Sequence, residues 1–244
     1  MVFAHGFGCD QTIWRYVAPA FEDRWRVILL DHVGAGSSRL DAYDPARYTT
    51  LDAYATDLLE VCAALAVTGG VFVGHSVGAM IGVLAAIAEP DRFERLVLIG
   101  PSPCYVDDGD YVGGFSRQDI DELLAAMDDN YLGWSSAIGP TIVGNAERPE
   151  LGAELTNSLC ATDPDIARQF ARVTFLSDNR ADLPRVPAPT LVLQCSDDPI
   201  APASVGAYVA QAIPDGTLRR LRATGHCPHL SAPAETVAAI EEFL

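Results

Sequence analysis

Short apolar runs separated by longer stretches of mixed polarity recur along the 244-residue chain. Most of these runs are apolar at nearly every position, which is typical of strands buried on both faces of a parallel sheet. The last run alternates irregularly between Leu and Arg, which favours a position near a sheet edge. Six strands are predicted in this way, at 2–5, 27–31, 71–75, 95–100, 190–195 and 217–223.

The segments between these strands carry apolar residues at helical spacing. Helices are predicted at 51–67, 76–93, 201–214 and 231–244, and Pro90 stops the second of them. Because strands and helices alternate along the chain, we expect an α/β protein with a doubly wound parallel sheet.

One long segment, 103–180, breaks this alternation because it contains no convincing strand. Helical patterns fill it instead, at 116–134, 148–160 and 163–175. Ser116 and Asp163 are predicted N-caps, and Pro149 and Pro164 occupy first helical positions. We therefore predict a core formed by 1–102 and 181–244 with an all-helical insertion at 103–180. Such an insertion is typical of a lid, and an ordinary packing subdomain is the alternative.

The charge pattern narrows the possible functions. The formal net charge is -17, and all 16 cationic residues are Arg. Without Lys there is no Schiff-base lysine and no P-loop lysine. An acidic chain repels phosphate backbones, so a nucleic-acid partner is not expected. No apolar run approaches the 18 or so residues of a membrane span, and no signal peptide is recognisable, so a cytoplasmic protein is expected.

The cysteines predict neither a disulfide framework nor a zinc site, because none has C-x-x-C spacing. Free thiols in a reducing cytosol are the simplest interpretation. His226, Cys227 and His229 are close together, but Pro228 and the lack of a matching Cys/His pair elsewhere disfavour a metal site. The six cysteines are Cys9, Cys62, Cys104, Cys160, Cys195 and Cys227.

A candidate nucleophile lies where the strand at 71–75 meets the following helix. Ser76 stands in a G-x-S-x-G motif, and Gly74 and Gly78 leave room for a tight strand-to-helix turn. A match to this five-residue motif occurs by chance in many sequences, so the motif alone is weak evidence for a nucleophile. A nucleophilic serine also needs a base, an acid that orients the base, and donors for the oxyanion, all at the carboxyl ends of the strands.

The other strand ends supply these groups. Asp197 and Asp198 follow the strand at 190–195, and His226 follows the strand at 217–223, which gives the chain order Ser, Asp, His of α/β-hydrolases. The local pattern does not discriminate between the two aspartates. His226 is favoured over His229 because it follows the strand directly, after a glycine.

The loop after the first strand, His5 to Gly8, completes the set of groups. In this arrangement the loop gives one oxyanion N–H and the residue after the nucleophile gives the other. The backbone amides of Phe7 and Val77 are therefore the candidate oxyanion donors.

A competing Gly-rich motif follows the strand at 27–31. Gly34 and Gly36 resemble the start of a dinucleotide fingerprint, but Arg39 stands where a third glycine is needed and no helix opens there. We reject this interpretation and expect structural roles for His32, and for His75 beside the nucleophile.

Five motifs together resemble a known family: "HGFGCDQTIW", "GHSVGAMIG", "GPSPCY", "LQCSDDPIAPASVG" and "GHCPHLSAP". From residue 5 to the C-terminus the chain resembles the RsbQ family of bacterial stress-response regulators and, more distantly, the plant strigolactone and karrikin receptors. This resemblance implies an α/β-hydrolase fold, a triad of Ser76, Asp198 and His226, and oxyanion amides of Phe7 and Val77.

The resemblance also implies a four-helix lid over a deep apolar pocket. Each candidate lining residue has an alternative role in the core of the lid. These residues are Phe7, Phe115, Trp134, Ile138 and Phe175.

One feature departs from the family. Its members begin with a β-hairpin before the His-Gly motif, and this hairpin is missing here, so either the start is truncated or something else covers the sheet edge that the hairpin would pair with. Without it the strand at 27–31 lies at a sheet edge, where unpaired backbone groups favour aggregation. We therefore expect six strands.

The sequence thus predicts a serine hydrolase that acts on a small apolar ester or lactone and needs no metal or organic cofactor. A serine in place of an aspartate nucleophile counts against haloalkane dehalogenases and epoxide hydrolases. The alternative, implied by the resemblance, is a regulator that senses a small ligand in the same pocket and acts on a PAS-domain phosphatase. Both functions need the same triad, so the sequence does not separate them.

Overall fold

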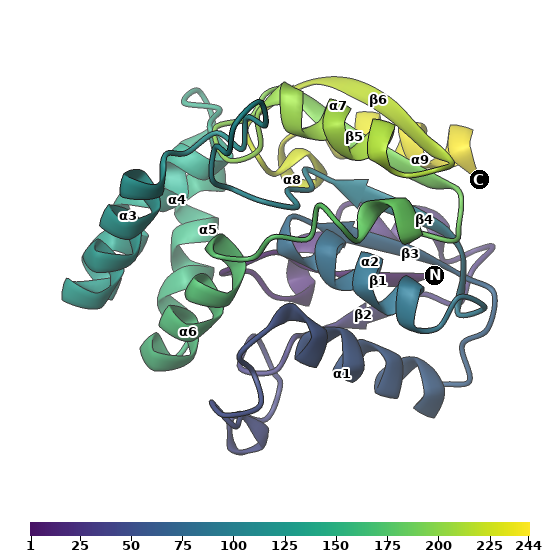
Figure 1. The fold of residues 1–244 in the computed structure, drawn as a ribbon, viewed down its shortest axis with the longest axis horizontal. Helices are drawn as coiled ribbons and strands as arrows, with labels where there is room; N and C mark the ends of the chain where they lie inside the picture. Colours follow the sequence, from purple (N-terminus) through teal and green to yellow (C-terminus); the bar gives the residue numbers. More distant parts are fainter.

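A single sheet of six parallel strands forms the centre of the computed structural model, which describes residues 1–244. The strand order is β2-β1-β3-β4-β5-β6, so β2 and β6 lie at the two edges (Figure 1). Six strands and both edge positions were predicted from the sequence, and all are confirmed. The strands are β1 (Val2–Ala4), β2 (Ile28–Leu30), β3 (Gly70–His75), β4 (Phe93–Ile99), β5 (Thr190–Asp197) and β6 (Gly216–Thr224).

Helices cover both faces of this sheet, which explains why its central strands are apolar at successive positions. Phe72 packs into a cluster with α1 and α2, whereas its neighbours Val71 and Val73 pack into a second cluster with Trp14 and α9. The helices of the core are α1 (Leu51–Ala64), α2 (Val77–Ala88), α7 (Ala203–Ala212), α8 (Pro228–Ser231) and α9 (Pro233–Phe243). None of the helices combines the length and the hydrophobicity that a membrane span requires.

Four helices lie between β4 and β5 in the chain and gather beyond one end of the sheet (Figure 1). Three of them begin as the sequence predicts, because Asp163 caps α6, Pro149 opens α5 and Ser116 caps α3. At the start of α3, Ser116 and Asp119 form a reciprocal capping box. The four are α3 (Arg117–Asp129), α4 (Tyr131–Val143), α5 (Pro149–Ala161) and α6 (Pro164–Phe175).

The predicted helix at 116–134 is wrong in one respect, because it is two helices. Asn130 ends α3 and caps α4 by accepting a hydrogen bond from the N–H of Gly133. The rest of α4 was not predicted because glycines and Pro140 interrupt its pattern. These small residues have a packing role: a Cβ at Gly152 of α5 would lie 2.9 Å from the Cα of Pro140, so the two helices touch through their backbones.

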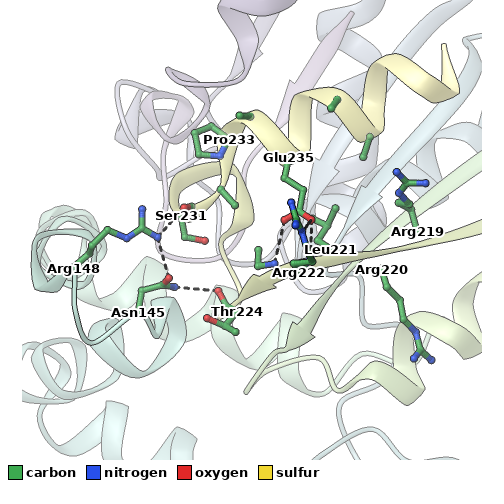
Figure 2. A pocket seen from close by; sticks show the side chains of 15 residues that line it. Asn145, Arg148, Arg219, Arg220, Leu221, Arg222, Thr224, Ser231, Pro233 and Glu235 are labelled. Carbon is green, nitrogen blue, oxygen red and sulfur yellow. Dashed lines mark hydrogen bonds and ion pairs between the residues drawn. The ribbon is translucent and has the colours of Figure 1, made fainter.

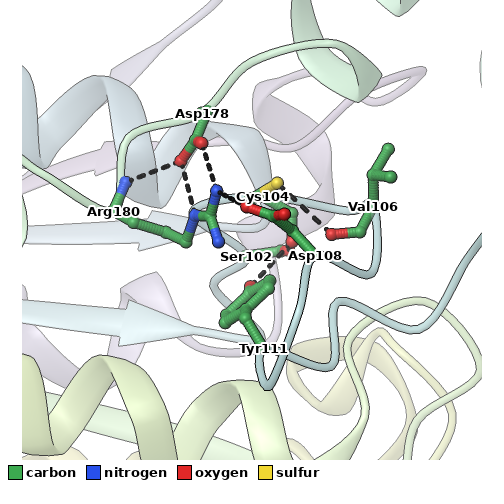
Figure 3. A network of polar contacts seen from close by, with 7 residues as sticks. All are labelled: Ser102, Cys104, Val106, Asp108, Tyr111, Asp178 and Arg180. Carbon is green, nitrogen blue, oxygen red and sulfur yellow. Dashed lines mark hydrogen bonds and ion pairs between the residues drawn. The ribbon is translucent and has the colours of Figure 1, made fainter. Parts of the chain in front are cut away.

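The two chain segments that join the helical insertion to the sheet are held together by a polar network (Figure 3). Cys104 and Asp178 form an isolated antiparallel bridge between them. Arg180 makes ion pairs with Asp178 at 2.6 Å and with Asp108 at 2.8 Å, and the hydroxyl of Tyr111 donates to the carbonyl of Cys104 at 2.7 Å. Both connections therefore leave the sheet as one cross-linked unit.

Candidate active site

Ser76 occupies a strained turn between β3 and α2. Its backbone has φ 56° and ψ -124°, a conformation that costs a non-glycine residue about 1–3 kcal/mol. Its N–H donates to the carbonyl of Ile99 at 2.9 Å, which ties the turn to the end of β4. Strain held by a rigid sheet at this position is typical of a nucleophile elbow.

The glycines that flank Ser76 allow the turn to form. A Cβ at Gly74 would lie 2.7 Å from the Cα of Ala79, and a Cβ at Gly78 would overlap the carbonyl oxygen of His5. The start of α2 therefore lies directly against the loop that follows β1. That loop also reaches Ser76, since a Cβ at Gly6 would lie 3.0 Å from the Cβ of Ser76.

Asp198 and His226 form a buried pair at the ends of β5 and β6. Nδ1 of His226 lies 2.8 Å from Oδ2 and 3.0 Å from Oδ1 of Asp198. Asp198 also accepts hydrogen bonds from the backbone N–H groups of Ile200 at 2.9 Å and Ala201 at 3.0 Å. These donors fix the orientation of the carboxylate. Of the two aspartates that the sequence left open, Asp198 contacts His226, while Asp197 is exposed.

The remaining ring nitrogen of His226, Nε2, is buried and has no hydrogen-bond partner. Because the charged Asp198 carboxylate only accepts hydrogen bonds, Nδ1 of His226 carries the proton and Nε2 offers its lone pair. A Cβ at Gly100, at the end of β4, would lie 3.0 Å from Cε1 of His226, so the imidazole is close to the strand end that binds the Ser76 turn. His229, the alternative base, packs instead against Trp14 and His75.

The helical insertion contacts the His226 loop, which sequence reasoning missed. The N–H of His226 donates to the carbonyl of Ile142 at 2.8 Å. Gly225, with φ 80°, packs so closely that a Cβ there would overlap the carbonyl oxygen of Val143. The end of α4 thus supports the position of His226. Gly225 could have indicated a close contact at this position, but the sequence does not show that the contact is with the end of α4.

Tyr105 is a second residue that sequence reasoning missed. Burial raises the pKa of its phenol to about 12, and the neighbouring Ser76 side chain acts in the opposite direction. The phenol is therefore neutral at physiological pH and lies beside Ser76. Its position in the "GPSPCY" motif, shortly after the end of β4, could have indicated this place, because the carboxyl ends of the strands converge on the site.

Aromatic side chains of the insertion gather around Phe7 of the loop after β1. Phe7 contacts the rings of Trp134, Phe170 and Phe175, with centroids 6.3, 5.8 and 6.1 Å away. Four of the five candidate lining residues, Phe7, Phe115, Trp134 and Phe175, share one apolar cluster with Tyr105. Ile138 packs against a second cluster, which Phe7 and Trp134 also contact. Phe170 was not among the candidates.

A large hollow on the surface lies away from these residues (Figure 2). This groove of about 1240 Å³ runs along the edge strand β6 and α9, and its lining includes Arg148, Arg219, Arg220 and Arg222. Glu235 in its wall accepts the backbone N–H of Arg222 at 2.9 Å, so part of the edge is already paired. Ser76, Asp198 and His226 do not line this groove. Its size alone does not make it the reaction centre.

A parallel sheet with a serine on a strained turn and a buried Asp–His pair at its carboxyl end defines the class of α/β-hydrolases. The profile of the Alpha/beta hydrolase family matches residues 1–240, and the chain belongs to this family. It is 42% identical to a strigolactone esterase of Arabidopsis thaliana over 245 residues, covering 100% of this chain and 91% of that protein.

Two further relatives extend the comparison. Karrikin insensitive 2 receptor CA of Petunia hybrida is 39% identical over 96% of this chain and 87% of its own length. The solved structure of a hydrolase from Oleispira antarctica superposes with a TM-score of 0.96 at 40% identity, covering 99% of this chain and 89% of that one. The expected resemblance to plant strigolactone and karrikin receptors is confirmed, and the relatives include proteins named as an esterase, as a hydrolase and as a receptor.

Proposed function

We propose that the protein is a serine hydrolase that cleaves a small apolar ester or lactone. The observation that carries the proposal is the buried Asp198–His226 pair, whose free Nε2 lies at the sheet end where Ser76 is held in strain. A carboxylate that orients a neutral imidazole beside a serine is the arrangement that activates a hydroxyl nucleophile.

The proposed reaction has two halves. Nε2 of His226 takes the Ser76 proton as Oγ bonds to the carbonyl carbon, and the backbone amides of Phe7 and Val77 stabilise the oxyanion. His226 then gives the proton to the leaving alkoxide, which leaves an acyl-serine. Water attacks this acyl group by the same route and regenerates Ser76.

The ring cluster that includes Phe7 and Tyr105 supports the choice of substrate. Phe7, Trp134 and Phe175 present apolar faces in this cluster. A charged substrate would lose hydration among these rings. A compact neutral ester or lactone matches this environment, and one relative is named a strigolactone esterase.

We also propose that residues 103–180 act as a lid over a core of 1–102 and 181–244. The polar network around Arg180 joins both connections of the insertion, and α4 contacts the His226 loop. Movement of the insertion would therefore reach the catalytic base as well as the pocket walls.

A second candidate function is ligand sensing, because a relative that this chain matches over 87% of its length is named a receptor. In that case hydrolysis or ligand binding would change the insertion, and a protein partner would read the change. A PAS-domain phosphatase is the partner suggested by the resemblance to the RsbQ family. Retention of the phosphatase on immobilised protein only when ligand is present would support this candidate.

Hydrolysis of p-nitrophenyl acetate tests the leading proposal. Ser76→Ala is expected to lower kcat by on the order of 10³-fold or more, because the nucleophile is lost. Ser136→Ala is the matched control, since Ser136 is exposed on α4 and bonds only within its own helix. Equal rates for Ser76→Ala and the wild type would overturn the proposal.

A further inference from the structure

Three side chains that the proposed hydrolysis does not use lie together beside the catalytic residues. A ring nitrogen of His75, a ring nitrogen of His229 and the Sγ of Cys227 all lie within 4.8 Å of one another. All three residues are buried, with exposed fractions of 2%, 0% and 1% respectively. The cluster joins the end of β3 to the start of α8.

The two imidazoles carry buried nitrogens that nothing in the fold satisfies. Both ring nitrogens of His229 and Nδ1 of His75 have no hydrogen-bond partner. Leaving one buried polar atom unpaired costs about 1–3 kcal/mol, and native proteins pair nearly all such atoms. Three in one cluster, next to a thiol, indicate that these atoms serve to bind a ligand.

We propose that His75, Cys227 and His229 form a binding site for one metal ion of the Zn²⁺ type. Two imidazoles and a thiolate are the donor set that zinc and its neighbours in the transition series prefer. In a tetrahedral zinc site with bonds of about 2.0–2.3 Å, ligand atoms lie about 3.3–3.7 Å apart, so the cluster must close by about 1 Å. Binding forms two metal–nitrogen bonds and one metal–sulfur bond, and the thiol proton of Cys227 passes to solvent. Water is the fourth ligand.

This site differs from the one considered in the sequence. The sequence disfavoured a metal site formed by His226, Cys227 and His229, because it showed no matching Cys/His pair elsewhere in the chain. The fold brings His75 from β3 into the cluster, and it turns His226 toward Asp198. The third ligand is thus a residue whose proximity the sequence does not reveal.

The position of the site makes the metal an inhibitor rather than a cofactor. His75 precedes Ser76, Cys227 follows His226, and Nε2 of His75 lies 2.9 Å from the carbonyl oxygen of His226. Closing the cluster by about 1 Å moves His75 and Cys227, which are the chain neighbours of the nucleophile and of the base. A misplacement of catalytic groups by that distance can cost about 10²-fold in rate. This consequence rests on the proposed hydrolase function, whereas metal binding itself does not.

Cobalt substitution tests the binding. Metal-free protein titrated with Co²⁺ is expected to take up one ion per chain and to develop thiolate-to-cobalt charge-transfer absorption. Cys227→Ser removes the thiolate and should abolish this absorption, and His229→Gln should weaken binding at least tenfold. Cys160→Ser, a change of a half-buried thiol on α5, is the matched control and should behave as the wild type. Circular dichroism checks that each variant is folded.

Activity gives a second, separate readout. Zn²⁺ should inhibit p-nitrophenyl acetate hydrolysis by the wild type and Cys160→Ser, and Cys227→Ser should need at least tenfold more Zn²⁺ for the same inhibition. Absence of stoichiometric cobalt binding, or absorption that survives in Cys227→Ser, would overturn the site. Binding without inhibition of an active enzyme would overturn the inhibitory role. An inactive wild type that still binds cobalt would contradict the hydrolase proposal and leave the metal site supported.

Discussion

Nδ1 of His226 lies 2.8 Å from Oδ2 of Asp198, and the side chain of Asp198 is wholly shielded from solvent. The two residues come from the ends of adjacent strands, β5 and β6. In this low-dielectric environment the carboxylate fixes both the orientation and the tautomer of the imidazole, so Nε2 is presented without a proton.

Replacing Asp198 with Asn should therefore lower kcat by about 10⁴-fold, because the amide can donate to Nδ1 and favours the wrong tautomer of His226. The change is nearly isosteric, so KM should change much less. Asp197→Asn is the matched control, because Asp197 is the exposed neighbour and does not contact His226. Steady-state kinetics with p-nitrophenyl acetate checks both, and similar losses in the two variants would contradict the assignment.

Tyr105→Phe removes the hydroxyl that interacts with Ser76 and keeps the ring packed against Phe175, with centroids 5.0 Å apart. If the phenol orients the nucleophile, kcat/KM should fall by about 10-fold, which corresponds to about 1.4 kcal/mol of transition-state stabilisation. Thermal unfolding should shift by only a few degrees. Tyr208→Phe changes a partly buried tyrosine outside the site and should retain full kcat/KM. An unaltered rate in Tyr105→Phe would assign the tyrosine a packing role alone.

Gly225→Ala tests the contact between the insertion and the catalytic base. The added Cβ would meet the carbonyl of Val143, and the left-handed backbone adds about 1–2 kcal/mol of strain. The loop that carries His226 must shift, so both kcat and the melting temperature should fall. At Gly69, also left-handed at φ 56°, a Cβ has nothing within 4 Å, so Gly69→Ala isolates the backbone cost. Comparable kinetics in the two variants would show that the contact does not position His226.

Much of the fold could be predicted because it follows from local physical rules. The buried strands show as apolar runs, and Asp163 and Ser116 mark helix starts by satisfying free backbone N–H groups. The convergence of Ser76 with the Asp–His pair is also predictable, since parallel strands end on the same side of a sheet.

The parts that could not be predicted depend on contacts between distant segments. Most of helix α4 was not predicted because Gly139 and Pro140 weaken its helical pattern. These residues are small because α5 approaches α4 closely there. The bond from His226 to Ile142 joins the core to the insertion, and no periodicity encodes it. The same holds for His75, which meets Cys227 only in the folded chain.

Acid should destabilise the protein through its buried histidines. Burial, together with the nearby His5, holds the pKa of His32 well below its ordinary value. The folded state therefore keeps His32 neutral, while the unfolded chain binds a proton below about pH 6.5. The free energy of unfolding should be highest above that pH and should fall as the pH drops toward the lowered pKa of the folded state. The slope from this residue is at most about 1.4 kcal/mol per pH unit. Urea unfolding between pH 7 and 5, in the presence of a chelator, should show a shallower slope for His32→Gln than for the wild type. Parallel slopes would mean that His32 titrates alike in both states.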